Sequence, residues 1–407
     1  MMAYSNKADE QQLMGGVKAE KGTKRYNRIR NCIFISGLSV FAQLYLFQPM
    51  LADLCVDFAI SPAMSSLAVS VSTVGMAVGL LIFAFKADSV SREKLMGFTL
   101  LLSSLLTILS AFVWDFPSLL VVNFLKGVVL SGVSAVALAY LTEEVSASVI
   151  GLAISLYLSG NTIGGMSGRV VAILVSGWSD WRWAAVVIGF VSLFLGFLFV
   201  RHIPHSEHFR PRRTDIREKL GNMATFIRTP LFLGMYFVAA LIMGAFVSVY
   251  NYLSFVLESP KFGLPHYVVA LIFMMYTAGV GGSLITGRLS DRRSPVMLLN
   301  LSILLMLGGL IMLMIMQLWA IIVGLGMMTF AFFSAHTMAS RIVSMTARTA
   351  KSSATCLYWL FYYIGSSVTG SLTGVVLTQH GWHSFLWVIV GLTVVAFVIG
   401  VTTTRRI

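Results

Sequence analysis

The sequence predicts an all-α membrane protein with twelve transmembrane helices arranged as two similar halves. Three observations lead to this prediction. The composition is 57% hydrophobic and only 11% charged, whereas soluble domains carry about 25% charged residues. Many apolar stretches reach the roughly 20 residues that an α-helix needs to cross a bilayer. In addition, several landmarks recur in the two halves of the chain at a nearly constant offset.

The expected helices follow one another with short polar turns between most of them. They lie near residues 31–50, 64–84, 95–114, 118–141, 150–175, 183–201, 230–256, 266–286, 295–315, 318–338, 352–377 and 384–403. The longest polar connection divides them into two groups of six. We therefore expect a disordered tail at 1–30, a first bundle at 31–201, a linker at 202–229, a second bundle at 230–403 and a short tail at 404–407.

Lysine and arginine are distributed very unevenly between the two sides of these helices. Of 29 such residues, 25 fall on the side of both termini, two (Arg182 and Lys261) on the opposite side and two (Lys126 and Arg169) within helices. Cytoplasmic loops carry the excess of Lys and Arg in membrane proteins, so we expect both termini to be cytoplasmic. This placement accounts for the net charge of +13 without a nucleic-acid partner.

The internal repeat is the strongest indication of function. The repeated pairs are Gln48 and Asn251, Pro62 and Pro265, and Asp88 and Asp291, each 203 residues apart, with Trp181 and Trp382 at 201. Repeated halves are typical of secondary transporters, in which the substrate binds between the halves near the bilayer midplane. The repeat therefore predicts a transporter that exposes this site to the two sides of the membrane in turn.

A short charged turn follows the second helix of each half. Its distinctive residues are Asp88, Arg92 and Lys94 in the first half and Gly287, Asp291 and Arg292 in the second. This pattern resembles the signature loop of the major facilitator superfamily. A carboxylate near a helix end can pair with arginines or cap a neighbouring helix. We expect the two turns to act as gating latches, with a plain topology signal as the alternative.

Two cations, Lys126 and Arg169, fall inside expected helices. A charge in the hydrocarbon region costs at least about 2.5–3.5 kcal/mol, so each is expected to face an aqueous cavity or a partner. A Lys126 side chain that snorkels to the membrane surface is the alternative. Arg169 ends a run that contains Gly160, Gly164 and Gly168. Glycines spaced by four let helices approach closely.

Amides and phenols inside the helices complete a predicted substrate cavity, because such groups are costly in lipid unless they line a cavity or pair with one another. The predicted cavity residues are Gln43, Gln48, Asn123, Lys126, Arg169, Tyr250, Asn251 and Tyr362. The strings Gln48-Pro-Met-Leu, Tyr250-Asn-Tyr-Leu and Phe361-Tyr-Tyr-Ile-Gly-Ser-Ser together resemble the YnfM-type group of the drug:proton antiporter branch. The resemblance implies a proton-coupled exporter in a bacterial inner membrane.

A proton-driven exporter needs a group that titrates, yet no Asp or Glu lies deep in any expected helix. The candidates are His336, Glu143 or Glu144 at a gate, or Lys126. For His336, a neutral hydrogen-bonded side chain is the alternative to a proton carrier. The same lack of a buried carboxylate favours a neutral or anionic substrate over an organic cation.

Other functional classes have little support. Cys32, Cys55 and Cys356 show neither metal-ligand spacing nor a disulfide pattern. The phosphate-binding loop of ATP-driven proteins is absent. The string Gly165-Met-Ser-Gly168 with His336 as a base would suit an intramembrane protease, but the half-chain repeat has no role there. We expect no enzyme, no cofactor and no metal, but a monomeric carrier of a small molecule and protons; an uncoupled or anion-coupled carrier is the alternative.

Overall fold

The structure, a computed structural model, describes residues 18–86, 89–146, 148–209 and 216–405. The first half contains α2 Lys24–Leu44, η1 Gln48–Met50, α3 Leu51–Phe58, α4 Pro62–Ser65, α5 Leu67–Lys86, α6 Arg92–Leu109, η3 Ser110–Phe112, α7 Phe116–Glu144, α8 Ile150–Trp178 and α9 Trp181–His202. The second contains α10 Ile216–Arg228, α11 Pro230–Leu257, α12 His266–Phe273, η4 Met274–Thr277, α13 Ala278–Leu289, α14 Pro295–Leu313, α15 Leu318–Thr346 and α16 Lys351–Thr404.

Ten helices within the described residues are long and apolar enough to cross a membrane. Two further features bring this number to the predicted twelve. The 29-residue α8 has the length of α7 but is richer in glycine and serine. The 54-residue α16 is two helices joined at Gly381, whose backbone has φ 73°. The all-α class predicted from the sequence is therefore confirmed.

The first helix differs from the prediction at both ends. It begins at Lys24, because Thr23 caps it by accepting a hydrogen bond from the Tyr26 backbone N–H at 3.2 Å. Residues 24–30, expected in the disordered tail, thus form its first turns. The expected helix 31–50 is also interrupted, since α2 ends at Leu44 and the chain continues through η1 into α3.

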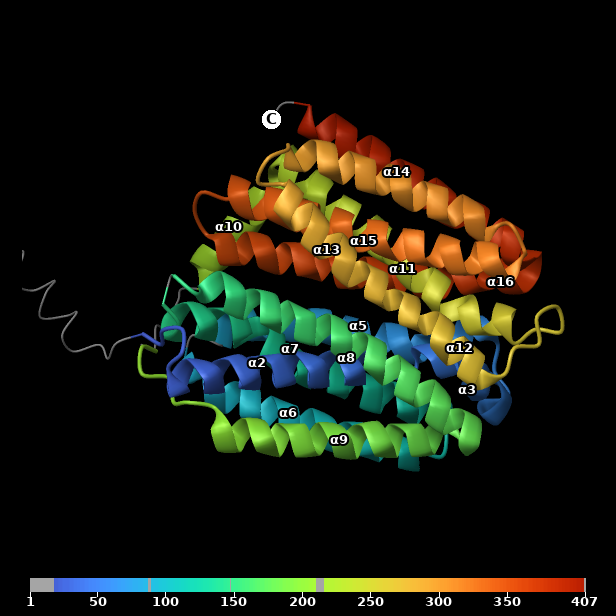
Figure 1. Cartoon of the computed structure of the whole chain (residues 1–407), viewed down its shortest axis with the longest axis horizontal. Helices are drawn as coiled ribbons and strands as arrows, with labels where there is room; N and C mark the ends of the chain where they lie inside the picture. Colours follow the sequence, from blue (N-terminus) through green and yellow to red (C-terminus); the bar gives the residue numbers. More distant parts are fainter. Residues whose placement is uncertain (1–17, 87–88, 147, 210–215, 406–407) are drawn as a thin grey trace, which may run out of the picture.

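The helices form two groups that lie side by side (Figure 1), α2 to α9 in blue to green and α11 to α16 in yellow to red. In the first group α2 packs on α8, and α7 packs on α5 and α6; in the second, α11 packs on α16, and α15 packs on α13 and α14. The glycine run in α8 explains one of these contacts. A Cβ at Gly160 or Gly164 would overlap the backbone oxygen of Phe34 or Leu38 in α2, so only glycine permits this approach.

The bundle has two ends and one surface between its halves. The terminal end carries the first residues of α2, the last residues of α16 and the linker helix α10; the far end carries α3, α4 and α12 (Figure 1). The seam is the surface where the two groups meet. Across it α5 packs on α16, α8 on α12 and η4, α4 on α16, and η1 and α3 on α11. Because η1, α3, α4 and α12 are all far-end elements, the halves are held together mainly there.

Candidate functional site

Arg169 of α8 lies at the seam, although it is only 1% exposed. Its Nε donates to Gln48 Oε1 at 2.7 Å, and its Nη1 donates to the Gly165 carbonyl at 2.6 Å. Both acceptors are neutral, and no carboxylate pairs with Arg169 among the described residues. The site therefore holds a positive charge that the protein itself does not balance.

Gln48 joins this arginine to the second half. Its Nε2 donates to Asn251 Oδ1 at 2.7 Å and to the Val247 carbonyl at 3.4 Å. Gln48 and Asn251 are both fully buried, and Asn251 Nδ2 has no hydrogen-bond partner within the described part of the chain. A continuous polar chain from Arg169 through Gln48 to Asn251 thus crosses the seam.

Three tyrosine rings surround the guanidinium. Arg169 Cζ lies 4.6 Å from the ring centroid of Tyr45, 4.7 Å from that of Tyr276 and 6.0 Å from that of Tyr250. Tyr45 belongs to the first half, and the other two belong to the second. Because ring faces attract cations, and more strongly in a desolvated site, the three rings help to stabilise the buried charge.

Hydroxyl groups form a second polar contact across the seam, between α5 and α16. Ser70 Oγ donates to the Ser367 carbonyl at 3.1 Å, Ser367 Oγ donates to the Ser70 carbonyl at 3.0 Å, and Ser371 Oγ donates to Ser70 Oγ at 2.7 Å. The Thr73 and Ser367 hydroxyls are 2.6 Å apart. All these bonds are neutral, so they can break and re-form without separating charges.

A row of aromatic side chains runs from the tyrosines around Arg169 into the second half. The Tyr276 and Phe246 centroids are 5.8 Å apart, Phe246 stacks on Phe332 at 4.0 Å, and Phe332 stacks on His336 at 6.1 Å. His336 Nδ1 lies 2.8 Å from Tyr358 Oη. Tyr362 lies beside this row, with its centroid 4.9 Å from that of His336. We call the chain Tyr276–Phe246–Phe332–His336 the aromatic row.

Three of the predicted cavity residues have their polar partners within the first half. Lys126 Nζ donates to Asn123 Oδ1 at 2.8 Å, and Asn123 Nδ2 donates to the Ala68 carbonyl at 3.2 Å. Lys126 also lies over the Phe47 ring at 4.8 Å. Gln43 accepts from Thr107 Oγ1 at 2.8 Å. The structure therefore separates Gln43, Asn123 and Lys126 from the group formed by Gln48, Arg169, Tyr250 and Asn251.

The signature loops are paired within their own halves where they are described. Asp291 Oδ1 accepts from both terminal nitrogens of Arg341, at 3.1 and 3.0 Å. Arg92 pairs with Glu143 at 3.1 Å. Lys94, Gly287 and Arg292 are not fully buried, and a Cβ at Gly287 would meet no atom within 4 Å. Asp88 lies outside the described residues.

Glu144, one of the proposed proton carriers, is fully buried at the terminal end and held by strong donors. Arg25 Nη2 donates to it at 2.6 Å, and the His208 backbone N–H and ring Nδ1 lie at 2.8 and 3.0 Å. Ala19 N donates to the Glu144 carbonyl at 2.8 Å. These contacts fasten the chain before α2 and the first part of the linker to α7.

The far end carries a group of titratable residues. Glu258 follows α11, and its Oε1 lies 3.4 Å from Nδ1 of His266 in the same half. Burial raises the pKa of the Glu258 carboxyl, and the Asp53 charge across the seam raises this pKa further, while His266 acts in the opposite direction. Nearby, Asp57 pairs with Arg182 at 2.6 Å.

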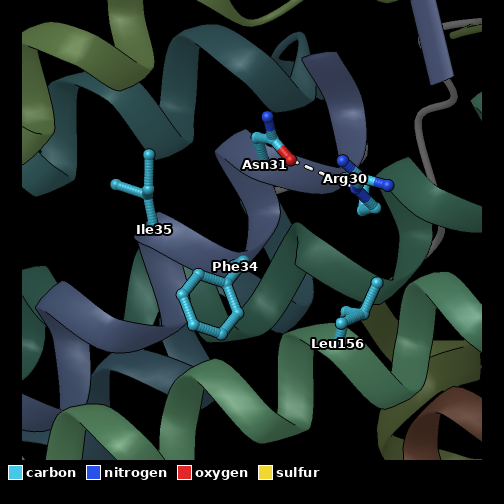
Figure 2. Close-up of a pocket in the computed structure, with 5 residues that line it drawn as sticks. All are labelled: Arg30, Asn31, Phe34, Ile35 and Leu156. Atoms are coloured by element: carbon cyan, nitrogen blue, oxygen red, sulfur yellow. Dashed lines mark hydrogen bonds between the residues drawn. The ribbon is translucent and has the colours of Figure 1, made fainter. Parts of the chain in front are cut away.

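Two of the cavities in the described part of the chain lie near the terminal end. One, of about 240 Å³, is drawn in Figure 2 and is lined by Arg30, Asn31, Phe34, Ile35 and Leu156. The other, of about 390 Å³, lies between α6 and α9 and is lined by Glu93, Lys94, Gly97, Phe98, Leu101, Val200, Ile203 and His205. The first is lined by the first half alone, and the second is also lined by the start of the linker. Neither includes a predicted substrate residue.

Some seam residues were missed by the sequence analysis. Tyr276 was not singled out, because a single tyrosine in an apolar helix carries little signal, and Ser367 was noted only as the last residue of the string that begins at Phe361. The 203-residue offset offered one clue, since it pairs Tyr276 with Thr73, and both lie at the seam.

The comparisons with known proteins agree with this architecture. Residues 33–370 match the family model described as Major Facilitator Superfamily. The chain is 35% identical over 390 residues to the inner membrane transport protein YnfM of Escherichia coli, covering 95% of this chain and 93% of that protein. It is 33% identical over 367 residues to the uncharacterized MFS-type transporter YybF of Bacillus subtilis, covering 90% of each.

Solved structures give the same fold. A bacterial homologue of the human lysosomal transporter Spinster, in an inward-facing and unoccupied conformation, aligns with a TM-score of 0.74 at 14% identity, covering 94% of this chain and 96% of that one. The nucleoside transporter NupG aligns with a TM-score of 0.71 at 15% identity, covering 93% and 100%. The family match, the two relatives and the shared fold lead to one conclusion: this chain belongs to the Major Facilitator Superfamily and is a multi-pass membrane transporter, not an enzyme.

Proposed function

We propose that this protein is a secondary active transporter of a bacterial inner membrane that exports a small molecule in exchange for protons. The observation that carries the proposal is the polar chain from Arg169 through Gln48 to Asn251, which crosses the seam between the repeated halves. Substrate sites of repeat-built transporters lie between the halves. Arg169, Gln48, Tyr250 and Asn251 are therefore assigned to the substrate site.

The seam is suited to alternating access. Several of the contacts that join the halves are hydrogen bonds between neutral groups, such as those of Gln48 with Asn251 and of Ser70 with Ser367. A hydrogen bond of this kind contributes about 0.5–1.5 kcal/mol net. A few of them hold the far end closed, yet substrate binding supplies enough free energy to replace them.

The distribution of charge supports the orientation. With 25 of the 29 Lys and Arg on the side of the termini, the positive-inside rule places both termini in the cytoplasm. The far end then faces the periplasm. Since the halves meet mainly at the far end, the described form is closed toward the periplasm. One chain supplies both halves, so a monomer is sufficient.

His336 is the group we assign to proton exchange. It is the only histidine well inside an expected helix; it is partly buried and lies at one end of the aromatic row, with Nδ1 2.8 Å from Tyr358 Oη. The ordinary pKa of histidine lies near physiological pH. Glu143 and Glu144 fit this role less well, because Arg92 and Arg25 pair with them.

An uncoupled or anion-coupled carrier is the second candidate. The observation that favours it is the buried positive charge of Arg169, which has only neutral acceptors and ring faces around it. Such a site can move an anion down its own gradient without a proton.

Inverted membrane vesicles test the two candidates. A proton gradient is imposed, aromatic and sugar-like compounds of positive, neutral and negative charge are added, and dissipation of the gradient is followed. Proton exchange predicts dissipation by at least one compound with wild-type protein and its loss with His336→Gln. The matched control is His380→Gln, because His380 is exposed and lies beside the Gly381 kink of α16. Substrate counterflow in proteoliposomes without any dissipation would contradict proton exchange and support the uncoupled carrier.

A further inference from the structure

We propose that the transported substrate is an aromatic organic anion, whose negative group binds between Arg169 and Asn251 and whose ring lies along the aromatic row. This inference rests on the proposed function, because it takes the seam to be the substrate site. It names the class of molecule that this site selects.

The Arg169 charge is the first feature of the site that selects an anion. Arg169 is 1% exposed, and in the described residues its guanidinium donates to the Gln48 and Gly165 oxygens and lies against three tyrosine side chains, with no carboxylate paired to it. A buried charge without a counter-ion is strongly unfavourable. The guanidinium also has five N–H donors in a planar fork that matches a carboxylate. An anion that displaces the Gln48 oxygen from Arg169 therefore supplies the missing charge.

The second feature is Asn251, which lies on the other side of the seam. Its Oδ1 accepts from Gln48 Nε2, but its Nδ2 is buried and has no acceptor within the described residues. A buried donor without a partner costs about 1–3 kcal/mol. A carboxylate has two oxygens, so it can accept from Arg169 in one half and from Asn251 in the other. Gln48 now occupies the position between these two residues.

The third feature is the aromatic row, which suits the body of the substrate. The aromatic row starts at Tyr276, whose ring centroid lies 4.7 Å from Arg169 Cζ, and it continues through the stacked rings of Phe246 and Phe332. A stacked or edge-to-face ring pair contributes about 0.5–1.5 kcal/mol beyond its buried area. The anion site and the buried aromatic row therefore adjoin each other, which suits a molecule with a charged group attached to a ring.

The same features disfavour the other substrate classes. An organic cation would meet the Arg169 charge with no carboxylate described nearby to offset it. A sugar would need many hydrogen-bonding partners, whereas the row offers mainly hydrocarbon from Phe246 and Phe332. A small anion without a ring would use Arg169 and Asn251 but leave the row without contact.

Binding of four small probes to the purified full chain tests the proposal. Benzoate, benzamide and benzylamine share one ring and differ in charge, and acetate carries the anion without the ring. Binding is measured from the ligand-induced rise in thermal unfolding temperature. We expect benzoate to bind at least tenfold more tightly than benzamide, benzylamine and acetate. Equal or tighter binding of benzamide or benzylamine, or no binding of benzoate, would overturn the proposal.

Three variants locate the site. Arg169→Gln is expected to remove the preference for benzoate over benzamide, and Arg169→Lys, which keeps the charge, is expected to retain part of it. Asn251→Leu is expected to weaken benzoate severalfold. Lys126→Met is the matched control, because Lys126 is also a buried cation but has its partner Asn123 in the first half. A loss of preference in Lys126→Met with none in Arg169→Gln would place the anion elsewhere.

The two proposals can fail separately. If benzoate binds with the expected preference but moves in proteoliposomes without a proton flux, the substrate class stands and proton exchange fails. If only benzylamine moves, and does so in exchange for protons, the transport mechanism stands and the anion site fails.

Discussion

Gln48 Nε2 donates a hydrogen bond to Asn251 Oδ1 at 2.7 Å, and the two residues are 203 positions apart. This is the offset at which the landmarks of the two halves repeat. The bond therefore joins equivalent positions of the two halves, and it lies where a two-fold axis between them would pass. A contact of this kind is well placed to report whether the far end is open or closed.

Replacing Gln48 by Leu should open the far end. The change removes the bonds to Asn251, Val247 and Arg169 and should shift the balance between closed and open forms by about 1–3 kcal/mol. Spin labels at Val56 and Tyr267, which are 84% and 62% exposed on opposite sides of the seam, measure the separation. We expect a new population of molecules in which the two labels are farther apart than in the wild-type protein.

The matched control is Gln43→Leu. Gln43 is also a buried glutamine and lies five residues before Gln48, but it forms hydrogen bonds with Ser39 and Thr107 within the first half. This variant should leave the label distance unchanged. Equal distance distributions in Gln48→Leu and the wild-type protein would show that Gln48 does not hold the seam.

A valine at Gly374 of α16 should prevent closure at the far end. A Cβ there would overlap the Tyr252 hydroxyl and come within 2.9 Å of Ala63 Cα across the seam. Overpacking of this kind typically costs about 1–3 kcal/mol, which opening of the seam would relieve. We expect longer label distances and loss of transport.

Gly391 provides the control for Gly374, because it also lies within a helix of α16, beyond the Gly381 kink, and a Cβ there meets no atom within 4 Å. Gly391→Val should keep the wild-type distances and activity. If both valine variants behaved alike, the effect would come from helix propensity and not from the seam.

Glu144→Gln should destabilise the first half. Glu144 is fully buried and accepts from His208 and from Arg25, whose side chain is 23% exposed, and leaving such hydrogen-bonding partners unsatisfied costs about 1–3 kcal/mol. A lower thermal unfolding temperature is the expected result. Glu143→Gln should cost less, since the Glu143 side chain is 26% exposed. A Glu144→Gln protein that unfolds normally but loses the pH dependence of transport would instead identify Glu144 as a proton carrier.

Acid should favour the form that is closed at the far end. Burial raises the pKa of Glu258 above its usual 4.5; His266 opposes this increase, and the Asp53 charge adds a smaller increase. A raised carboxyl pKa means that the closed form binds the proton more tightly. Protonation of Glu258 therefore stabilises the closed form fully below the usual pKa, and this stabilisation is lost as pH rises through the raised pKa.

The label distances test this prediction. The distances between the labels should shorten as pH falls from neutral toward 4.5. The Glu258→Gln protein should keep the short distances of the closed form across that range. The groups that face Glu258 are His266 in its own half and Asp53 in the other, and Asp180 also faces Asp53. Each of these three residues is replaced singly to check that the pH response does not come from its own titration. Distances that do not respond to pH in the wild-type protein would refute the prediction.

Much of the fold was predictable because it depends on local properties of the chain. The length of the apolar runs determines which segments can cross a bilayer, and the offset of Gln48 from Asn251 revealed the repeat. Single residues also predicted packing: the glycines of α8 implied close helices, and they lie directly on the α2 backbone. The break after Leu44 was not predicted, since Gln48 and Pro49 lie inside an otherwise apolar stretch.

The candidate site was predictable only in part. Gln48, Arg169, Tyr250 and Asn251 do gather at the seam, whereas Gln43 and Lys126 turn into the first half. All six are polar residues in apolar helices, so the sequence treats them alike. Hydrophobicity orients a helix only when one face is polar, and these helices are apolar nearly all round.

The sequence by itself thus determined that this protein is a two-halved bundle of membrane helices with its positive charge at one end, because hydropathy and charge act segment by segment. Only the tertiary structure decided which buried polar groups meet. The rotation of each helix about its axis is set by close packing, such as that of Gly164 on Leu38. That rotation places Arg169 beside Gln48 and leaves Lys126 beside Asn123.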